Sequence, residues 1–119
     1  MNLIFFHYPK CSTSQKAKKW LNSADVKYFE RHMVEENPSS WELEFWWKMS
    51  NLPLKKFFNT SGVLYKQLGL KDKLPQMTAE EQLQLLGTNG LLVKRPLLVG
   101  EDFVLVGFRE EAWQNKLLR

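Results

Sequence analysis

The sequence contains one cysteine, Cys11, and only two histidines among its 119 residues. One cysteine excludes an internal disulfide, and an unpaired thiol fits a reducing compartment, so we expect a cytoplasmic protein. One cysteine and two histidines cannot supply the four ligands of a structural zinc site, and we expect no bound metal. The glycines form neither a phosphate-binding loop nor a dinucleotide-binding fingerprint.

Long hydrophobic runs and a strong charge of one sign are also lacking. No apolar run approaches the roughly 20 residues of a membrane-spanning helix, and the first one is too short for a secretory signal. The 17 basic and 13 acidic residues give a net charge of +4, and the basic ones are spread along the chain. We therefore expect binding neither to a membrane nor directly to nucleic acid. The length and the 44% hydrophobic content fit one domain over residues 1–119.

The first third of the chain has the pattern of a strand, a helix and a second strand. The continuous apolar run at residues 3–6 is typical of a strand that is buried on both faces. A helix that carries Ala17, Trp20 and Leu21 on one face is expected to begin at a cap provided by Ser12 or Thr13. Residues 26–31 are rich in aromatic and β-branched side chains and predict the second strand.

The middle of the chain, at about residues 37–90, predicts a helical insert. Two segments have Ser or Thr followed by Glu three residues later, the signature of a capping box: Ser39 with Glu42, and Thr78 with Glu81. The turn that ends at Gly62 is expected to use a positive φ there. The first helix of the insert has an aromatic stripe that we expect to pack into the core, formed by Trp41, Phe45, Trp46 and Met49.

Strands return near the C-terminus. Residues 97–99 and 103–106 flank a short Gly-containing loop and predict a hairpin. A last helix that carries Trp113 is expected after Gly107. The element order β-α-β, helical insert, β-β-α predicts an α/β protein with a four-stranded mixed sheet.

Cys11 lies between the first strand and the start of the following helix. The unpaired N–H groups and the positive dipole end of a helix N-terminus favour a thiolate and lower a thiol pKa. The alternative is an inert, buried cysteine. Ser14 follows three residues later, on the same helix face, where its hydroxyl either donates to the thiolate or only caps the helix.

Arg95 precedes Pro96 just before the third strand. An X–Pro bond tolerates the cis isomer, and the residue before a proline is held extended. The planar guanidinium of Arg95 is suited to an oxyanion or a carboxylate, and the alternative is an ordinary surface arginine. By default, His7 stabilises its loop, and Asn59 belongs to a turn.

Four segments, in this order, resemble the ArsC family, which includes glutaredoxin-coupled arsenate reductases and Spx-type transcriptional regulators. They cover nearly the whole chain and read HYPKCSTS at 7–14, FNTSG at 58–62, YKQLGLKDKL at 65–74 and KRPLLV at 94–99. The resemblance implies a thioredoxin-like fold with a helical insert.

The resemblance also implies roles for single residues. Cys11 occupies the place of the nucleophile that attacks arsenate, and Arg95 matches one of three arginines around the oxyanion. Asn59 and Gly107 stand at the places of the other two, with Arg109 close to the second, so arsenate does not follow as the substrate. The predicted catalytic residues are Cys11, Ser14 and Arg95. The residues expected to bind substrate are Ser12, Thr13, Asn59, Pro96 and Arg109.

Two functional hypotheses follow. In the first, the protein is a monothiol oxidoreductase that acts on a small thiol compound or oxyanion. It binds no cofactor and depends on an external thiol such as glutathione, bacillithiol or a partner redoxin. In the second, it is an Spx-like regulator that binds the C-terminal domain of the RNA polymerase α subunit. Ser14 replaces the second cysteine of the Cys-x-x-Cys switch that many such regulators carry, so that switch is excluded.

Overall fold

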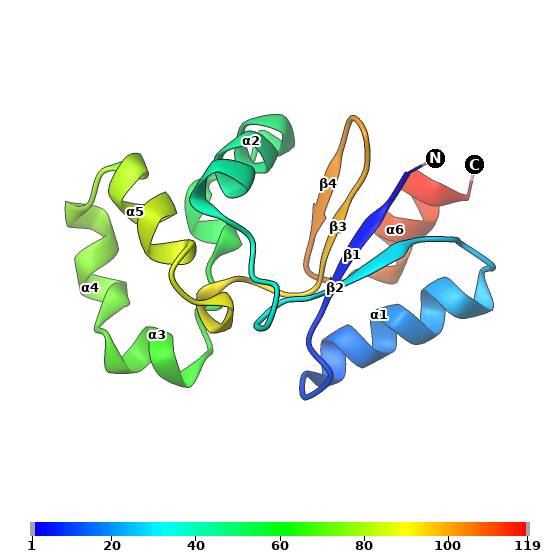
Figure 1. Ribbon diagram of the computed structural model, residues 1–119, viewed down its shortest axis with the longest axis horizontal. Coiled ribbons are helices and arrows are strands. Elements are labelled where there is room, and N and C mark those ends of the chain that lie inside the picture. The colour runs from blue at the N-terminus through cyan, green and yellow to red at the C-terminus, as the bar shows by residue number, and fades with distance from the viewer. Residues whose placement is uncertain (1, 119) are drawn as a thin grey trace.

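A four-stranded mixed sheet forms the centre of the protein in the computed structural model, which describes residues 2–118 (Figure 1). The order across the sheet is β2-β1-β3-β4, with β1 parallel to β2 and β3 antiparallel to both β1 and β4. The predicted mixed sheet is confirmed. The strands are β1 Ile4–His7, β2 Phe29–His32, β3 Leu97–Val99 and β4 Val104–Val106.

Six α-helices surround this sheet in the described part of the chain. The four helices of the insert, α2 to α5, lie between β2 and β3 in the sequence, whereas α1 follows β1 and α6 follows β4. The order is the one expected for a thioredoxin-like fold with a helical insert. No helix within residues 2–118 is both long and apolar enough to cross a bilayer. The helices are α1 Ser12–Ser23, α2 Ser40–Ser50, α3 Val63–Gln67, α4 Leu70–Lys73, α5 Ala79–Leu86 and α6 Glu110–Leu117.

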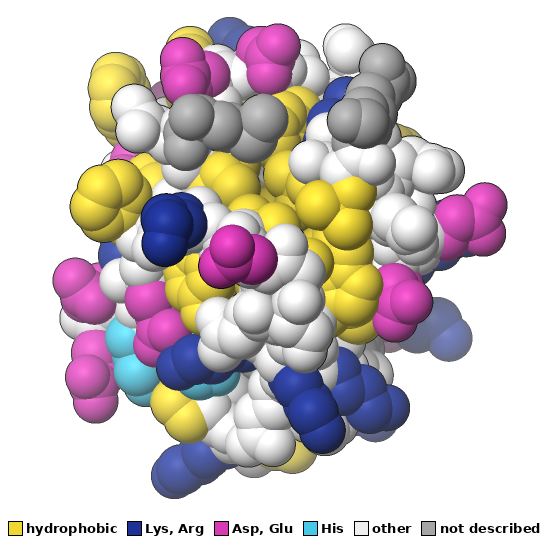
Figure 2. All heavy atoms as spheres, turned by 90° about the vertical axis from the view of Figure 1, so that its right-hand side faces the viewer, with side chains coloured by type: hydrophobic (Ala, Val, Ile, Leu, Met, Phe, Trp, Pro, Cys, Tyr) yellow, Lys and Arg dark blue, Asp and Glu magenta, His cyan; other side chains and the backbone are white. Residues whose placement is uncertain are grey.

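The two faces of the sheet bury two separate hydrophobic cores. Because side chains alternate along a strand, neighbouring residues of β1 enter different cores. Phe5 packs with Leu21 of α1 and Trp113 of α6, and Phe6 packs against Trp46 of the insert with ring centroids 5.3 Å apart. The insert and the α1–α6 pair therefore lie on opposite faces of the sheet (Figure 1). On the side formed by α1 and α6, Figure 2 shows a strip of hydrophobic surface bordered by charged side chains.

The aromatic stripe predicted for α2 is wrong in part. Trp41 and Phe45 are 76% and 59% exposed, whereas Trp46 is buried and Met49 is half-buried against the core. Residues four apart share one side of a helix, which is why Trp41 and Phe45 face outward together. The side that meets the sheet instead carries Leu43 and Trp46, three residues apart.

Both predicted capping boxes are present. The Ser39 hydroxyl accepts from the Glu42 N–H at 3.1 Å, and the Glu42 carboxylate accepts from the Ser39 N–H at 3.0 Å. Thr78 and Glu81 repeat this exchange at the start of α5. Glu42 also pairs with both terminal nitrogens of Arg31, at 2.7 and 3.0 Å, and so ties β2 to the insert.

Two further local expectations differ from the structure. Gly62 has a φ of −77°, and its missing Cβ leaves space for the Asn59 side chain, whose amide nitrogen would lie 2.6 Å from a Cβ there. The glycines that do have a positive φ are Gly69, at +64°, and Gly107, at +74°. The second strand begins at Phe29 rather than at Val26, because the Val26 side chain packs against the α1–α6 core before strand pairing starts.

Candidate functional site

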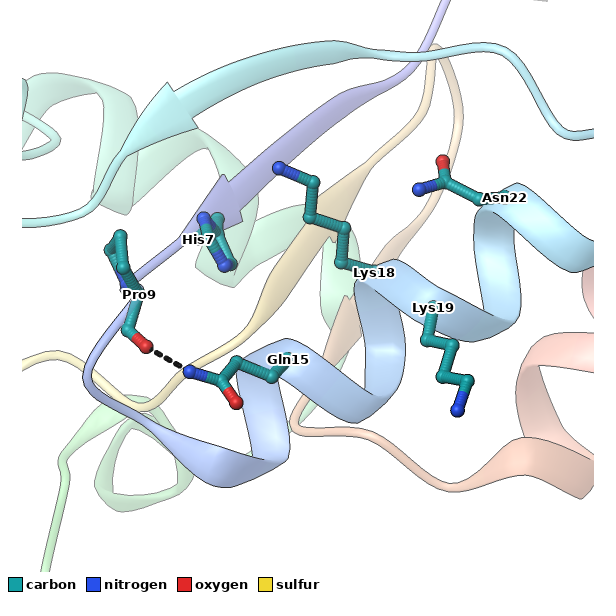
Figure 3. A pocket seen from close by; sticks show the side chains of 6 residues that line it. All are labelled: His7, Pro9, Gln15, Lys18, Lys19 and Asn22. Atoms are coloured by element: carbon teal, nitrogen blue, oxygen red, sulfur yellow. Dashed lines mark hydrogen bonds between the residues drawn. The ribbon is translucent and has the colours of Figure 1, made fainter.

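The loop between β1 and α1 holds Cys11 in the N-cap position of the helix. The Cys11 N–H donates to the Tyr8 carbonyl at 2.9 Å, which closes a tight turn after the strand. The Gln15 side-chain amide donates to the Pro9 carbonyl and ties this turn to the helix (Figure 3). The predicted cap at Ser12 or Thr13 is wrong, since Ser12 is already the first helical residue and Cys11 precedes it. The half-exposed thiol therefore faces the free N–H groups of the first turn.

The surroundings of Cys11 lower the pKa of its thiol. Burial has the largest single effect and raises the pKa, but four interactions outweigh it together. The N–H and the hydroxyl of Ser14, the guanidinium of Arg95 and the N–H of Thr13 all favour the thiolate. Groups at the start of α1 and Arg95, which is distant in sequence, thus stabilise the same thiolate.

Ser14 is the nearest helical partner of this sulfur. Its side chain is fully buried, and the hydroxyl oxygen has no hydrogen-bond partner among the described residues. The Cys11 side chain makes no fully formed capping bond, but the Ser14 hydroxyl contributes to the lowered pKa of the thiol. The Cys11 sulfur is therefore the group that this hydroxyl faces, and the thiolate is a better acceptor than the thiol.

Arg95 reaches the same place from the segment before β3. Its guanidinium lies over the Tyr8 ring, 4.7 Å from the ring centroid, and donates to the Leu91 carbonyl at 3.4 Å. Its Nε is buried without a hydrogen-bond partner in the described structure. The Arg95–Pro96 peptide bond is cis, the isomer that an X–Pro bond tolerates. Stacking on Tyr8 thus holds the guanidinium of Arg95 beside Cys11, and its Nε–H can still donate a hydrogen bond.

Asn59 belongs to the same neighbourhood. Its backbone N–H donates to the Leu92 carbonyl at 2.8 Å, and its side-chain amide reaches the Leu91 carbonyl at 3.5 Å. Arg95 donates to this same Leu91 carbonyl. A neutral amide therefore lies next to Arg95, where the family resemblance implies a second arginine. Pro96 is buried, and its carbonyl accepts from the Gly107 N–H at 2.8 Å.

Arg109 lies on the segment that joins β4 to α6. It is the N-cap residue of α6, and its side chain makes no ion pair with any residue of 2–118. It lines a groove of about 750 Å³ together with Lys55, Lys56 and Lys94. We call this feature the basic groove. The structure thus brings Cys11, Ser14 and Arg95 together and places Arg109 in the basic groove. Ser12 and Thr13 are exposed in the first turn of α1.

Two residues near the thiol gain a role that sequence reasoning did not assign to them. The Tyr8 ring lies under the guanidinium of Arg95. In the sequence, the only indication of this contact was the position of Tyr8 in the motif that contains Cys11. His7 is buried, with Nδ1 3.5 Å from the Glu30 carboxylate and Nε2 without a partner within residues 2–118. Burial lowers the pKa of His7, and the nearby Lys18 cation acts in the same direction, whereas Glu30 opposes them.

His7 also lines a shallow hollow between the end of β1 and helix α1 (Figure 3). Lys18 extends toward β2, where its Nζ lies 2.9 Å from the Glu30 carboxylate, and Lys19 points away from it. The Lys18 charge is therefore already paired inside the fold. This hollow therefore lies beside the buried His7, and we assign it no part in the thiol chemistry.

The sheet order, the helical insert and the position of Cys11 at the start of α1 define an α/β protein with a thioredoxin-like fold. The chain belongs to the ArsC family, whose model matches residues 6–116. The crystal structure of an ArsC family related protein from Bacteroides fragilis superposes with a TM-score of 0.94 and is 58% identical, covering 97% of each chain.

Two curated relatives come from Bacillus subtilis. The uncharacterized protein YusI is 48% identical over 97% of this chain and 98% of its own length. The regulatory protein MgsR is 30% identical over 89% of this chain and 82% of its own length. Reductase-like folds and regulators are thus both among the relatives of this chain.

Proposed function

We propose that this protein is a monothiol oxidoreductase in which Cys11 is the nucleophile. The observation that carries the proposal is the convergence of Ser14 and Arg95 on one half-exposed sulfur, with a lowered thiol pKa as the result. A thiolate is the reactive form of cysteine, and its fraction at neutral pH rises as the pKa falls. An inert structural cysteine needs no such arrangement.

The reaction that fits is thiol–disulfide exchange with a small disulfide. The Cys11 thiolate attacks one sulfur of the disulfide, the old S–S bond breaks, and a thiolate leaves as a mixed disulfide forms on Cys11. No second cysteine exists in the chain to resolve this intermediate. An external thiolate must attack the mixed disulfide, which releases Cys11 and forms a new small disulfide. Glutathione, bacillithiol or a partner redoxin would supply that thiol, in a reducing compartment such as the cytoplasm.

The charge of the site argues against arsenate as the substrate. A doubly charged oxyanion needs several fixed cations, and Arg95 is the arginine that acts on the sulfur. Asn59 offers a neutral amide, and Arg109 lies in the basic groove. One arginine is enough to orient a single carboxylate of a small thiol compound.

The test is the pH dependence of Cys11 alkylation by iodoacetamide, followed by intact-mass analysis. We expect a thiol pKa below about 8.5, the unperturbed value. We also expect one mixed-disulfide adduct on Cys11 after exposure to oxidised glutathione, released again by excess reduced thiol. A pKa at or above the unperturbed value, or the absence of an adduct, would contradict the proposal.

A second candidate function is regulation of transcription by binding the RNA polymerase α subunit. The similarity to MgsR, over most of both chains, supports this candidate. A pull-down with the isolated C-terminal domain of the α subunit tests it. Retention of that domain by the protein and by a Cys11→Ser variant alike would favour regulation. No retention, together with disulfide exchange, would leave the oxidoreductase.

A further inference from the structure

The basic groove lies at the end of the sheet where Cys11 also lies. Phe6, Leu97 and Val106 are register neighbours across β1, β3 and β4, so the chain leaves β1, enters β3 and leaves β4 at one edge. Lys94 directly precedes Arg95 in the sequence. A partner seated in the basic groove would therefore lie at the same end of the sheet as the thiol.

Four cations line this groove without a counter-charge. Lys55, Lys56, Lys94 and Arg109 are all exposed, and none of them takes part in an ion pair within the described structure. No aspartate or glutamate lines the groove. Like charges held close together repel one another, and a bound anionic group removes that cost. The positive charge of the groove therefore favours a ligand that carries acidic groups.

The backbone under these cations is held in place by hydrogen bonds. The Lys94 N–H donates to the Phe57 carbonyl at 2.8 Å, and Phe58 forms an isolated bridge with Val93. The Lys56 N–H donates to the Pro53 carbonyl at 3.0 Å. The lysines therefore extend from a fixed frame, and binding a partner costs mainly the freedom of their side chains.

The groove also has apolar walls, and these favour a ligand that has apolar groups as well as negative charge. Leu52, Pro53, Phe58 and Val106 line it between the cations. Water takes about 30 Å³ per molecule in the liquid, and a tetrahedral oxyanion is only a few times larger, so it would leave most of the 750 Å³ unfilled. A nucleic-acid backbone would match the charge but would gain little from apolar walls.

We propose that the basic groove binds an acidic segment of a partner polypeptide, in which at least two carboxylates flank an apolar side chain. The carboxylates pair with Lys56, Lys94 and their neighbours at the rim, and the apolar side chain packs against Leu52 and Val106. This inference goes beyond the proposed disulfide exchange, because it concerns a partner protein and needs no chemistry at Cys11.

The first experiment is a selection from a random peptide library displayed on phage, with the full-length protein as bait. We expect the enriched peptides to be rich in Asp and Glu and to contain at least one large apolar residue. Enrichment of basic or neutral peptides, or no enrichment at all, would overturn the proposal.

The second experiment measures the affinity of the most enriched peptide by fluorescence anisotropy. Charge reversal at two rim positions, Lys56→Glu with Lys94→Glu, should weaken binding by about tenfold or more. The matched control, Lys66→Glu with Lys73→Glu, makes the same change in net charge at exposed sites outside the groove. It should change binding by less than about threefold, because distant surface charges are screened by salt.

Other results of this assay would distinguish an acidic peptide from non-specific charge attraction, inorganic phosphate or a nucleic acid. Equal loss of affinity in both double variants would mean non-specific attraction and would overturn the proposal. Full displacement of the peptide by millimolar inorganic phosphate, or equally tight binding of a single-stranded oligonucleotide of the same charge, would also overturn it. Melting curves of both variants verify that they are folded. The assay involves no thiol exchange, so its result is independent of whether Cys11 is active.

Discussion

Replacing Ser14 by alanine separates the reactivity of Cys11 from the stability of the fold. The Ser14 hydroxyl is fully buried and lacks a hydrogen-bond partner among residues 2–118, yet it lowers the pKa of the neighbouring thiol. A buried hydroxyl without a partner costs about 1–3 kcal/mol of folding free energy. The same group stabilises the thiolate once the proton has left. Ser14→Ala should therefore make the thiol less reactive and the protein no less stable.

The expected loss of reactivity is moderate. A fully formed hydrogen bond to a charged group contributes about 1.5–3 kcal/mol. The Ser14 hydroxyl and the sulfur do not meet hydrogen-bond geometry in the described structure, and the half-exposed sulfur is partly screened by water. We take about 1 kcal/mol, which lowers the thiolate fraction roughly fivefold on the acid side of the titration. The pKa of Cys11 should rise accordingly.

The effect on stability depends on pH. The lowered pKa of Cys11 stabilises the wild-type fold above the ordinary thiol range, and this contribution is lost as the pH falls through the folded-state pKa. On the acid side of the Cys11 titration, which the test samples at pH 5, the alanine variant should be more stable by about 1 kcal/mol, because a protonated thiol makes less use of the hydroxyl, with helix propensity adding to the gain. At pH 9.5 the advantage should shrink or vanish, because the wild-type thiolate then uses the hydroxyl.

Two measurements test this reasoning. Iodoacetamide alkylation rates between pH 4 and pH 10 report the thiol pKa, and urea unfolding at both pH values, followed by the fluorescence of the five tryptophans, reports stability. Thr13→Ala is the matched control, since Thr13 acts on the sulfur through its backbone N–H, which the substitution keeps. An unchanged or lowered thiol pKa in Ser14→Ala, or a variant clearly less stable at pH 5, would refute the argument.

Four further substitutions have expected outcomes. Arg95→Gln removes the cation beside the thiol and should raise its pKa, and an unchanged alkylation profile would contradict the assigned contact. The bond to Arg31 is the main reason that the pKa of Glu42 is lowered, although burial opposes this effect. The ionised carboxylate therefore stabilises the fold at neutral pH, and this contribution is lost as the pH falls through the pKa of Glu42 in the folded state. Glu42→Gln should cost about 1–2 kcal/mol at pH 7 in urea unfolding, and a gap that stayed constant into strong acid would argue against the ion pair. Trp46→Ala should destabilise by about 3–5 kcal/mol and Trp41→Ala by less than about 0.5 kcal/mol, and thermal unfolding would expose a reversed order.

Much of the fold could be predicted from short-range patterns. The capping boxes at Ser39 and Thr78 were correct because their partners lie only three residues away on the same helical turn. The apolar run of β1 indicated a strand covered on both faces, and Phe5 and Phe6 of β1 do enter the two cores on opposite faces of the sheet. The α/β order, the mixed sheet and the thioredoxin-like arrangement are confirmed.

Predictions about packing were less accurate. The aromatic residues of α2 suggested one wide buried stripe, but the sheet covers only the side that carries Leu43 and Trp46. Gly62 was expected to need a positive φ, and it instead leaves room for the Asn59 side chain. Both features depend on what lies opposite in space, which spacing along the chain does not report.

The sequence by itself determined the nucleophile candidate and its nearest neighbour, since Cys11 and Ser14 lie one helical turn apart at a predictable helix start. The absence of a second cysteine also excluded an internal disulfide cycle. The tertiary structure decided the rest, because long-range contacts depend on how the strands pair. Pairing of β3 with β1 brings Arg95 onto Tyr8 and beside the thiol. The position of α6 after β4 places Arg109 in the basic groove, among lysines from two other segments.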